Sequence, residues 1–104
     1  MKTTDKIRQQ LKDHPVILYM KGTPEEPRCG FSAKAAGVMT ASGVPFAHVD
    51  VLSSPLIKEA LPEVSDFPTF PQLFIGGELM GGSDIIEEMM NSGELMPLLK
   101  ASVA

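Results

Sequence analysis

The segment VILYMKGTPEEPRCGFSAKAAGVMTA, residues 16–41, predicts a strand, a loop and a helix in direct succession. Its first five residues, 16–20, are all apolar, as in a strand buried at the centre of a sheet. Residues 21–28 contain one glycine and two prolines and predict a loop. A helix then begins near Cys29, and Gly43 suits its C-terminal cap. We expect four residues to form the apolar face of this helix: Phe31, Ala35, Val38 and Met39.

Boundary residues predict the other helices of the chain. Ser54 is expected to cap a short helix with Pro55 in its first turn, and Pro62 is expected to end it. Ser83 and Asp84 are expected to cap a later helix. The predicted helices besides the one at Cys29 are therefore at residues 4–14, 54–62, 83–90 and 95–100.

Three further strands are predicted at residues 46–51, 72–75 and 78–80. Gly76 and Gly77 supply a two-residue turn between the last two. The order of elements is then α-β-α-β-α-β-β-α-α, in which one βαβ unit precedes a hairpin. The sequence therefore predicts an α/β fold with a four-stranded mixed sheet flanked by helices on both faces.

Composition limits the protein's class. A chain of 104 residues, 43% of them hydrophobic, suffices for one core, so we expect a single domain over residues 1–104. No apolar run approaches the about 20 residues that cross a membrane, and the N-terminal segment lacks an apolar signal core. We therefore expect a cytoplasmic protein without membrane contact. The net charge of −4 and the lack of a basic stripe argue against nucleic-acid binding.

Cys29 is the only cysteine, so no disulfide can form within the chain. Unpaired backbone N–H groups at a helix start favour the thiolate over the thiol. Lys21, Arg28 and Lys34 lie near it in sequence, either as a cationic rim around the sulfur or as ordinary surface charge. The alternative to a reactive thiol is a small buried apolar residue, which the surrounding proline- and charge-rich loop disfavours.

Two more segments bear on ligand binding. From spacing alone, the Phe70–Pro71 bond is expected to be trans, because most X–Pro bonds in folded proteins are. Residues 81–84 (GGSD) place two glycines, a hydroxyl and a carboxylate at a helix start, where they could bind an anionic group and an amine. Read alone, the same four residues are equally typical of a glycine turn with an ordinary helix cap.

Four ordered segments carry a further signal: residues 19–24 (YMKGTP), 27–32 (PRCGFS), 68–73 (PTFPQL) and 77–84 (GELMGGSD). Together they resemble the monothiol glutaredoxins of the Cys-Gly-Phe-Ser type. The resemblance covers nearly the whole chain, and the long stretch between Lys21 and Cys29 is similar to that class. It implies a thioredoxin-like fold with glutathione bound beside the cysteine.

The resemblance also implies a role for each residue of a glutathione site. Lys21 and Lys58 would face a glutathione carboxylate. The backbone of Phe70, before a cis proline, would pair with the tripeptide in β fashion. Ser83 and Asp84 would hold the γ-glutamyl end, with Asp84 meeting its amine.

Three positions depart from the pattern of this family. Ser83 stands where many relatives have a cysteine, so the usual second thiol is missing. Lys58 stands where an arginine is common, and a lysine cannot reproduce the bidentate fork of a guanidinium. Phe67 replaces the usual tryptophan.

The leading functional hypothesis follows from the number of thiolates. The resemblance implies that Cys29 ligates a [2Fe–2S] cluster, which normally needs four thiolates. Two chains and two glutathiones would supply them in a symmetric homodimer, as in a carrier that delivers clusters to apo iron–sulfur proteins and serves iron homeostasis. The resemblance adds a mixed complex with a BolA-like protein. The alternative is a glutathione-dependent thiol–disulfide oxidoreductase with Cys29 as nucleophile, for which we expect weak turnover or none.

Overall fold

The computed structural model describes residues 2–104, whose elements follow the predicted order α-β-α-β-α-β-β-α-α. The helices are α1 (Thr3–Asp13), α2 (Gly30–Ala41), α3 (Pro55–Ser65), α4 (Ser83–Ser92) and α5 (Leu95–Val103). The strands are β1 (Val16–Met20), β2 (Ala47–Asp50), β3 (Gln72–Ile75) and β4 (Glu78–Gly81). None of the helices in this described part of the chain is long and apolar enough to cross a membrane.

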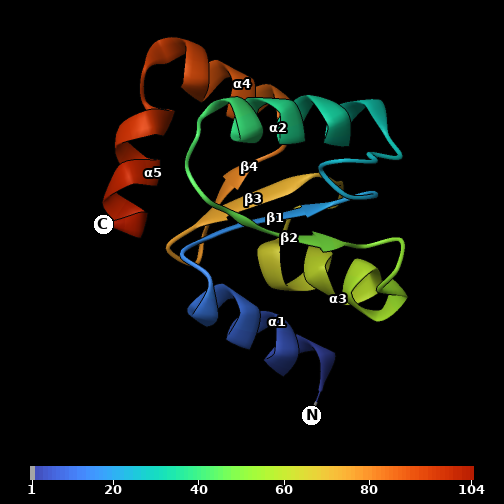
Figure 1. Ribbon diagram of the computed structural model, residues 1–104. Helices are drawn as coiled ribbons and strands as arrows, with labels where there is room; N and C mark the ends of the chain where they lie inside the picture. The colour runs from blue at the N-terminus through green and yellow to red at the C-terminus, as the bar shows by residue number, and fades with distance from the viewer. Residues whose placement is uncertain (1) are drawn as a thin grey trace.

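The four strands form one mixed sheet in the order β2-β1-β3-β4. β1 pairs with β2 in parallel and with β3 antiparallel, and β3 and β4 form the antiparallel hairpin. Figure 1 shows α1 and α3 on one face of this sheet and α2, α4 and α5 on the other. The predicted α/β, thioredoxin-like arrangement is therefore confirmed.

The apolar run of β1 is explained by its place between two layers of helices. Because successive side chains of a strand point to opposite faces, Val16, Leu18 and Met20 pack in the core beneath α2, α4 and α5. Ile17 and Tyr19 pack in the second core, against α1 and α3. Every residue of the strand is buried, so apolar side chains are needed on both of its faces and do not alternate with polar ones.

Three of the four residues predicted for the apolar face of helix α2 face the core: Ala35, Val38 and Met39. Phe31 was expected on its apolar face, but this side chain is 63% exposed. The buried positions are Ser32, Ala35, Ala36 and Met39, which have the i, i+3, i+4, i+7 spacing of one helix face. The prediction failed for Phe31 because it ranked residues by hydrophobicity. The buried place in the first turn belongs instead to Ser32, which has a hydrogen-bond partner.

Two helix-boundary predictions were also wrong. Pro62 lies inside α3, which continues to Ser65 although proline cannot donate the usual backbone bond. The buried Leu61 and the packed Val64 hold this last turn against the sheet. Helix α4 has Gly82 as its N-cap, and no side chain caps it, so Ser83 is its first residue instead.

Candidate functional site

A groove of about 760 Å³ lies beside Cys29 and between five separate parts of the chain. Its walls come from the end of β1, the start of α2, the middle of α3, the segment before β3 and the start of α4. All six residues predicted for the site line it: Lys21, Cys29, Lys58, Phe70, Ser83 and Asp84. The fold therefore brings together residues that the sequence separates by more than sixty positions.

Cys29 occupies the N-cap position of α2, as predicted. The residue is half-buried, and its extended backbone (φ −152°, ψ 138°) lets the chain turn into the helix behind it. The backbone N–H of Ser32, directed at the sulfur, is the main cause that lowers the pKa of the Cys29 thiol. The backbone N–H of Phe31, the Ser32 hydroxyl and the charge of Lys21 act in the same direction, against partial desolvation. The thiolate is therefore favoured at this position.

Only one of the three expected rim cations acts on the sulfur. Lys21 lines the groove and lowers the pKa of Cys29. The Arg28 guanidinium instead lies 3.9 Å from the Glu26 carboxylate. The predicted cationic rim is thus reduced to Lys21 near the sulfur and Lys58 farther along the groove.

Lys34 joins α2 to α4 instead of facing the sulfur. Its Nζ atom lies 3.1 Å from Asp84 Oδ1 and 3.2 Å from Glu87 Oε1. These two carboxylates raise the pKa of the Lys34 ammonium, with Asp84 contributing most. The Asp84 side chain is still 84% exposed, so it stays accessible from the groove while one of its oxygens is paired.

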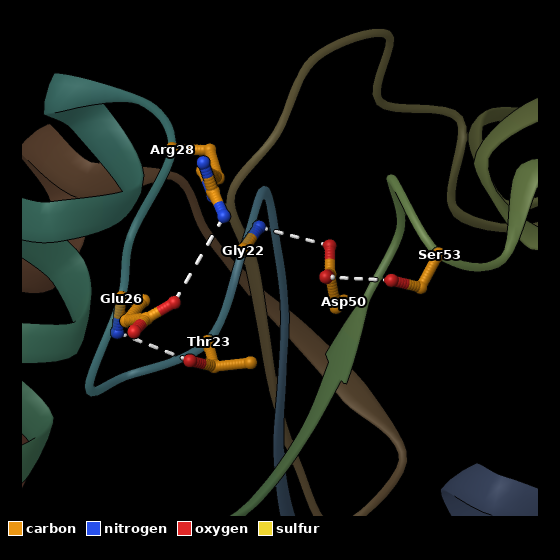
Figure 2. A network of polar contacts seen from close by, with 6 residues as sticks. All are labelled: Gly22, Thr23, Glu26, Arg28, Asp50 and Ser53. Atoms are coloured by element: carbon orange, nitrogen blue, oxygen red, sulfur yellow. Dashed lines mark hydrogen bonds and ion pairs between the residues drawn. The ribbon is translucent and has the colours of Figure 1, made fainter.

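The loop before Cys29 is held by bonds within it and by one bond to Asp50, as Figure 2 shows. Within it, the backbone N–H of Glu26 donates to the Thr23 hydroxyl at 3.0 Å. The Asp50 carboxylate, at the end of β2, accepts from the N–H of Gly22 at 2.9 Å and from the Ser53 hydroxyl at 2.9 Å. The loop is therefore fixed to the neighbouring strand instead of standing free in solvent.

Another wall of the groove is the segment 67–71, which links α3 to β3. The Phe70–Pro71 peptide bond is cis, so the expectation from spacing alone was wrong and that from the family resemblance was right. The side-chain amide of Gln72 donates to the carbonyl oxygens of Phe67 at 2.9 Å and Thr69 at 3.1 Å. Gly82 lies close to this segment, since a Cβ atom at Gly82 would be 3.4 Å from the Pro71 carbonyl oxygen.

Three residues that shape the site were not predicted from the sequence. Ser32, Asp50 and Gln72 make hydrogen bonds to backbone groups of the groove walls, and Ser32 and Gln72 are fully buried. For Gln72 a signal existed, because an amide opens an otherwise apolar strand. For Asp50 there was also a signal, because a carboxylate near the end of an alternating strand can accept hydrogen bonds from a nearby turn.

Metal chemistry at this site is limited by the supply of ligands. Among residues 2–104, no group of three or more His, Cys, Asp or Glu side chains is placed to hold a metal ion. Cys29 is the only side chain among residues 2–104 that can supply a thiolate, and it is accessible from the groove. The donor set therefore fits an iron–sulfur cluster only if other molecules supply the remaining thiolates.

Known proteins resemble this chain in sequence and in structure. The family model named Glutaredoxin matches residues 16–80. Glutaredoxin 4 of Haemophilus ducreyi is 53% identical over 100 residues, covering 96% of this chain and 94% of its own length. The probable monothiol glutaredoxin GrlA of Legionella pneumophila is 59% identical over 88 residues, covering 85% of this chain and 99% of its own.

The solved structures include the solution structure of a monomeric truncated mutant of Trypanosoma brucei 1-C-Grx1. It superposes with a TM-score of 0.86 at 39% identity, covering 97% of this chain and 91% of that chain. The likeness therefore extends over the sheet, both helical layers and the groove.

Proposed function

Because this chain belongs to the glutaredoxin family and has a single cysteine, we propose that it is a glutathione-dependent carrier of [2Fe–2S] clusters. The cluster is cargo, held between two copies of the chain. The observation that supports this most directly is that Cys29, whose pKa is lowered, lines a groove that contains no second thiol.

Glutathione is proposed to lie along the groove with its thiol next to Cys29. Lys21 and Lys58 supply positive charge for its carboxylate. The exposed backbone of Phe70 pairs with the tripeptide as a neighbouring strand would. At the far wall, Ser83 at the N-terminus of α4 and the accessible Asp84 carboxylate receive the γ-glutamyl end.

The ligand count then sets the assembly. One thiolate per chain and one per glutathione give four when two chains meet about a two-fold axis. Thiolates borrowed from a small molecule exchange readily, which suits delivery to apo iron–sulfur proteins. The family resemblance adds a mixed complex, in which a BolA-like protein takes the place of one copy of the chain. A single unpaired thiol suits the reducing cytoplasm as the place of action.

Anaerobic reconstitution with iron, sulfide and glutathione tests this proposal. We expect a coloured protein of dimeric mass, and we expect Cys29→Ser to give a colourless monomer. Reconstitution of the wild type without glutathione is the matched control and is expected to give little colour. A colourless monomer under full conditions, or full loading without glutathione, contradicts the proposal.

The lowered pKa of Cys29 supports a second candidate, an oxidoreductase acting on glutathione mixed disulfides. The Cys29 thiolate would attack the glutathione sulfur, form Cys29–S–SG and release the protein thiolate. The thiolate of a second glutathione would then attack Cys29–S–SG, which gives glutathione disulfide and restores Cys29. The loop before Cys29, tied to Asp50 (Figure 2), argues against an easy approach of that second glutathione. Rapid turnover by the cluster-free monomer would favour the enzyme over the carrier.

A further inference from the structure

Gln72 is a buried polar side chain at the start of an otherwise apolar strand. Its exposed fraction is 0%, and its backbone pairs with Tyr19 in the middle of the sheet. The side-chain nitrogen donates two hydrogen bonds, whereas the side-chain oxygen is buried without a partner among residues 2–104. Burial of an unpaired oxygen costs free energy, so the two donated bonds must offset that cost.

Both donated bonds go to the groove wall. They reach the carbonyl oxygens of Phe67 and Thr69, which directly precede Phe70 in the same segment. In the described part of the chain, residues 67–71 form no backbone–backbone hydrogen bond, and two of the five are prolines without an N–H. Besides a long contact of 3.5 Å from the Ser65 hydroxyl to Phe67, the amide of Gln72 is the polar tether of this wall.

We propose that Gln72 is a positioning residue, whose donor nitrogen holds the 67–71 wall in the geometry that binds glutathione. This inference rests on the proposed glutathione site and adds to it a residue that does not itself line the groove. The nitrogen is the essential atom, since the oxygen has no partner to lose. A side chain of the same shape without a donor should therefore fold and still bind glutathione poorly.

Gln72→Met is the test variant, because methionine has nearly the same length and no N–H. Ile75→Val is the matched control, a mild truncation at the buried far end of the same strand. We expect calorimetric titration with reduced glutathione to show affinity at least about tenfold lower for Gln72→Met and unchanged for Ile75→Val. The alkylation rate of Cys29 should be the same in both, because its N–H donors lie on α2.

Amide hydrogen exchange without ligand supplies the second readout. We expect the β1 amides of Gln72→Met to keep the protection of the wild type, because the two lost bonds lie in the 67–71 wall and not in the sheet. Equal glutathione affinity in Gln72→Met and the wild type would overturn this inference alone. Exchange that rises throughout the sheet would overturn it too, because Gln72 would then serve the core in general. A wild type that binds no glutathione at all would instead overturn the proposed function together with this inference.

Discussion

The Ser32 hydroxyl oxygen accepts a hydrogen bond from the backbone N–H of Lys21 at 3.0 Å. Ser32 is fully buried in the first turn of α2, and Lys21 directly follows β1. This bond fixes the helix start that carries Cys29 against the end of the central strand. It explains why a hydroxyl, and not an apolar group, occupies the buried position of the Cys-Gly-Phe-Ser motif.

Replacing Ser32 by alanine should destabilise the protein by about 1–3 kcal/mol, because the Lys21 N–H loses its acceptor in a buried place. Urea denaturation measures this change. Ser92→Ala is the control, since its hydroxyl donates to the Met89 carbonyl at an exposed helix end and should matter little. Equal midpoints for the two variants would mean that water replaces the lost bond.

The Cys29 thiol should titrate below the about 8.5 of a free cysteine. The pKa is lowered mainly by the Ser32 N–H, so at a given pH the thiolate fraction is higher than that of a free cysteine. The rate of alkylation by iodoacetamide against pH measures it. Lys21→Ala should raise the midpoint and Lys100→Ala should not, since only Lys21 adds its charge to the effect on the sulfur. A midpoint at or above the free value contradicts this reading of the site.

Lys58→Arg should tighten glutathione binding by about two- to fivefold, the range of an improved exposed ion pair. The side chain reaches the groove, and a guanidinium can grip a carboxylate with two parallel bonds where an ammonium cannot. Calorimetric titration gives the affinity, with Lys100→Arg as the control on α5. An unchanged glutathione affinity in Lys58→Arg would mean that the ligand carboxylate does not bind at Lys58.

Gly22→Ala should cost well over about 1–2 kcal/mol and slow Cys29 alkylation. Gly22 has φ +90°, and a Cβ atom there would collide with the Glu26 carbonyl oxygen within the loop. Gly43→Ala is the matched control, because Gly43 also has positive φ (+72°) but open space around it. Gly43→Ala should therefore lose only the stability that a positive φ costs an alanine. Similar losses of stability in the two variants would show that the loop shifts to make room for the added methyl group.

Asp50→Asn should destabilise the protein near neutral pH by about 1–2 kcal/mol, because a charged acceptor is lost. The N–H of Gly22 is the main cause that holds the pKa of Asp50 below its usual value. A depressed folded-state pKa contributes stability above the unfolded value of about 3.9, and that contribution is lost as pH falls through the folded value.

Unfolding midpoints in urea at several pH values test the Asp50 prediction. The wild type should lose stability from about pH 5 to pH 3 more steeply than Asp50→Asn does. Glu59→Gln, at an exposed position of α3, should follow the wild type. Parallel pH profiles for all three proteins would rule out a contribution from Asp50.

Local sequence rules predicted the elements because these depend on near neighbours. The apolar run of β1, the glycine turn at 76–77 and the proline at the start of α3 each act within a few residues. The same rules misplaced Phe31 and Pro62, where packing overrode propensity. The buried place went to a hydroxyl whose partner, the Lys21 N–H, directly follows β1, and the burial of Leu61 kept α3 helical past its proline.

The sequence by itself determined that the chain has one sulfur at a helix start and no second thiol, so chemistry beyond one thiolate needs outside ligands. Only the tertiary structure decided which polar groups meet. Lys34 pairs with Asp84 across 50 positions, and Gly22 with Asp50 across 28. Such pairs depend on how the helical layers dock on the sheet, because hydrogen bonds form only within about 3 Å and local propensity carries no information about that docking.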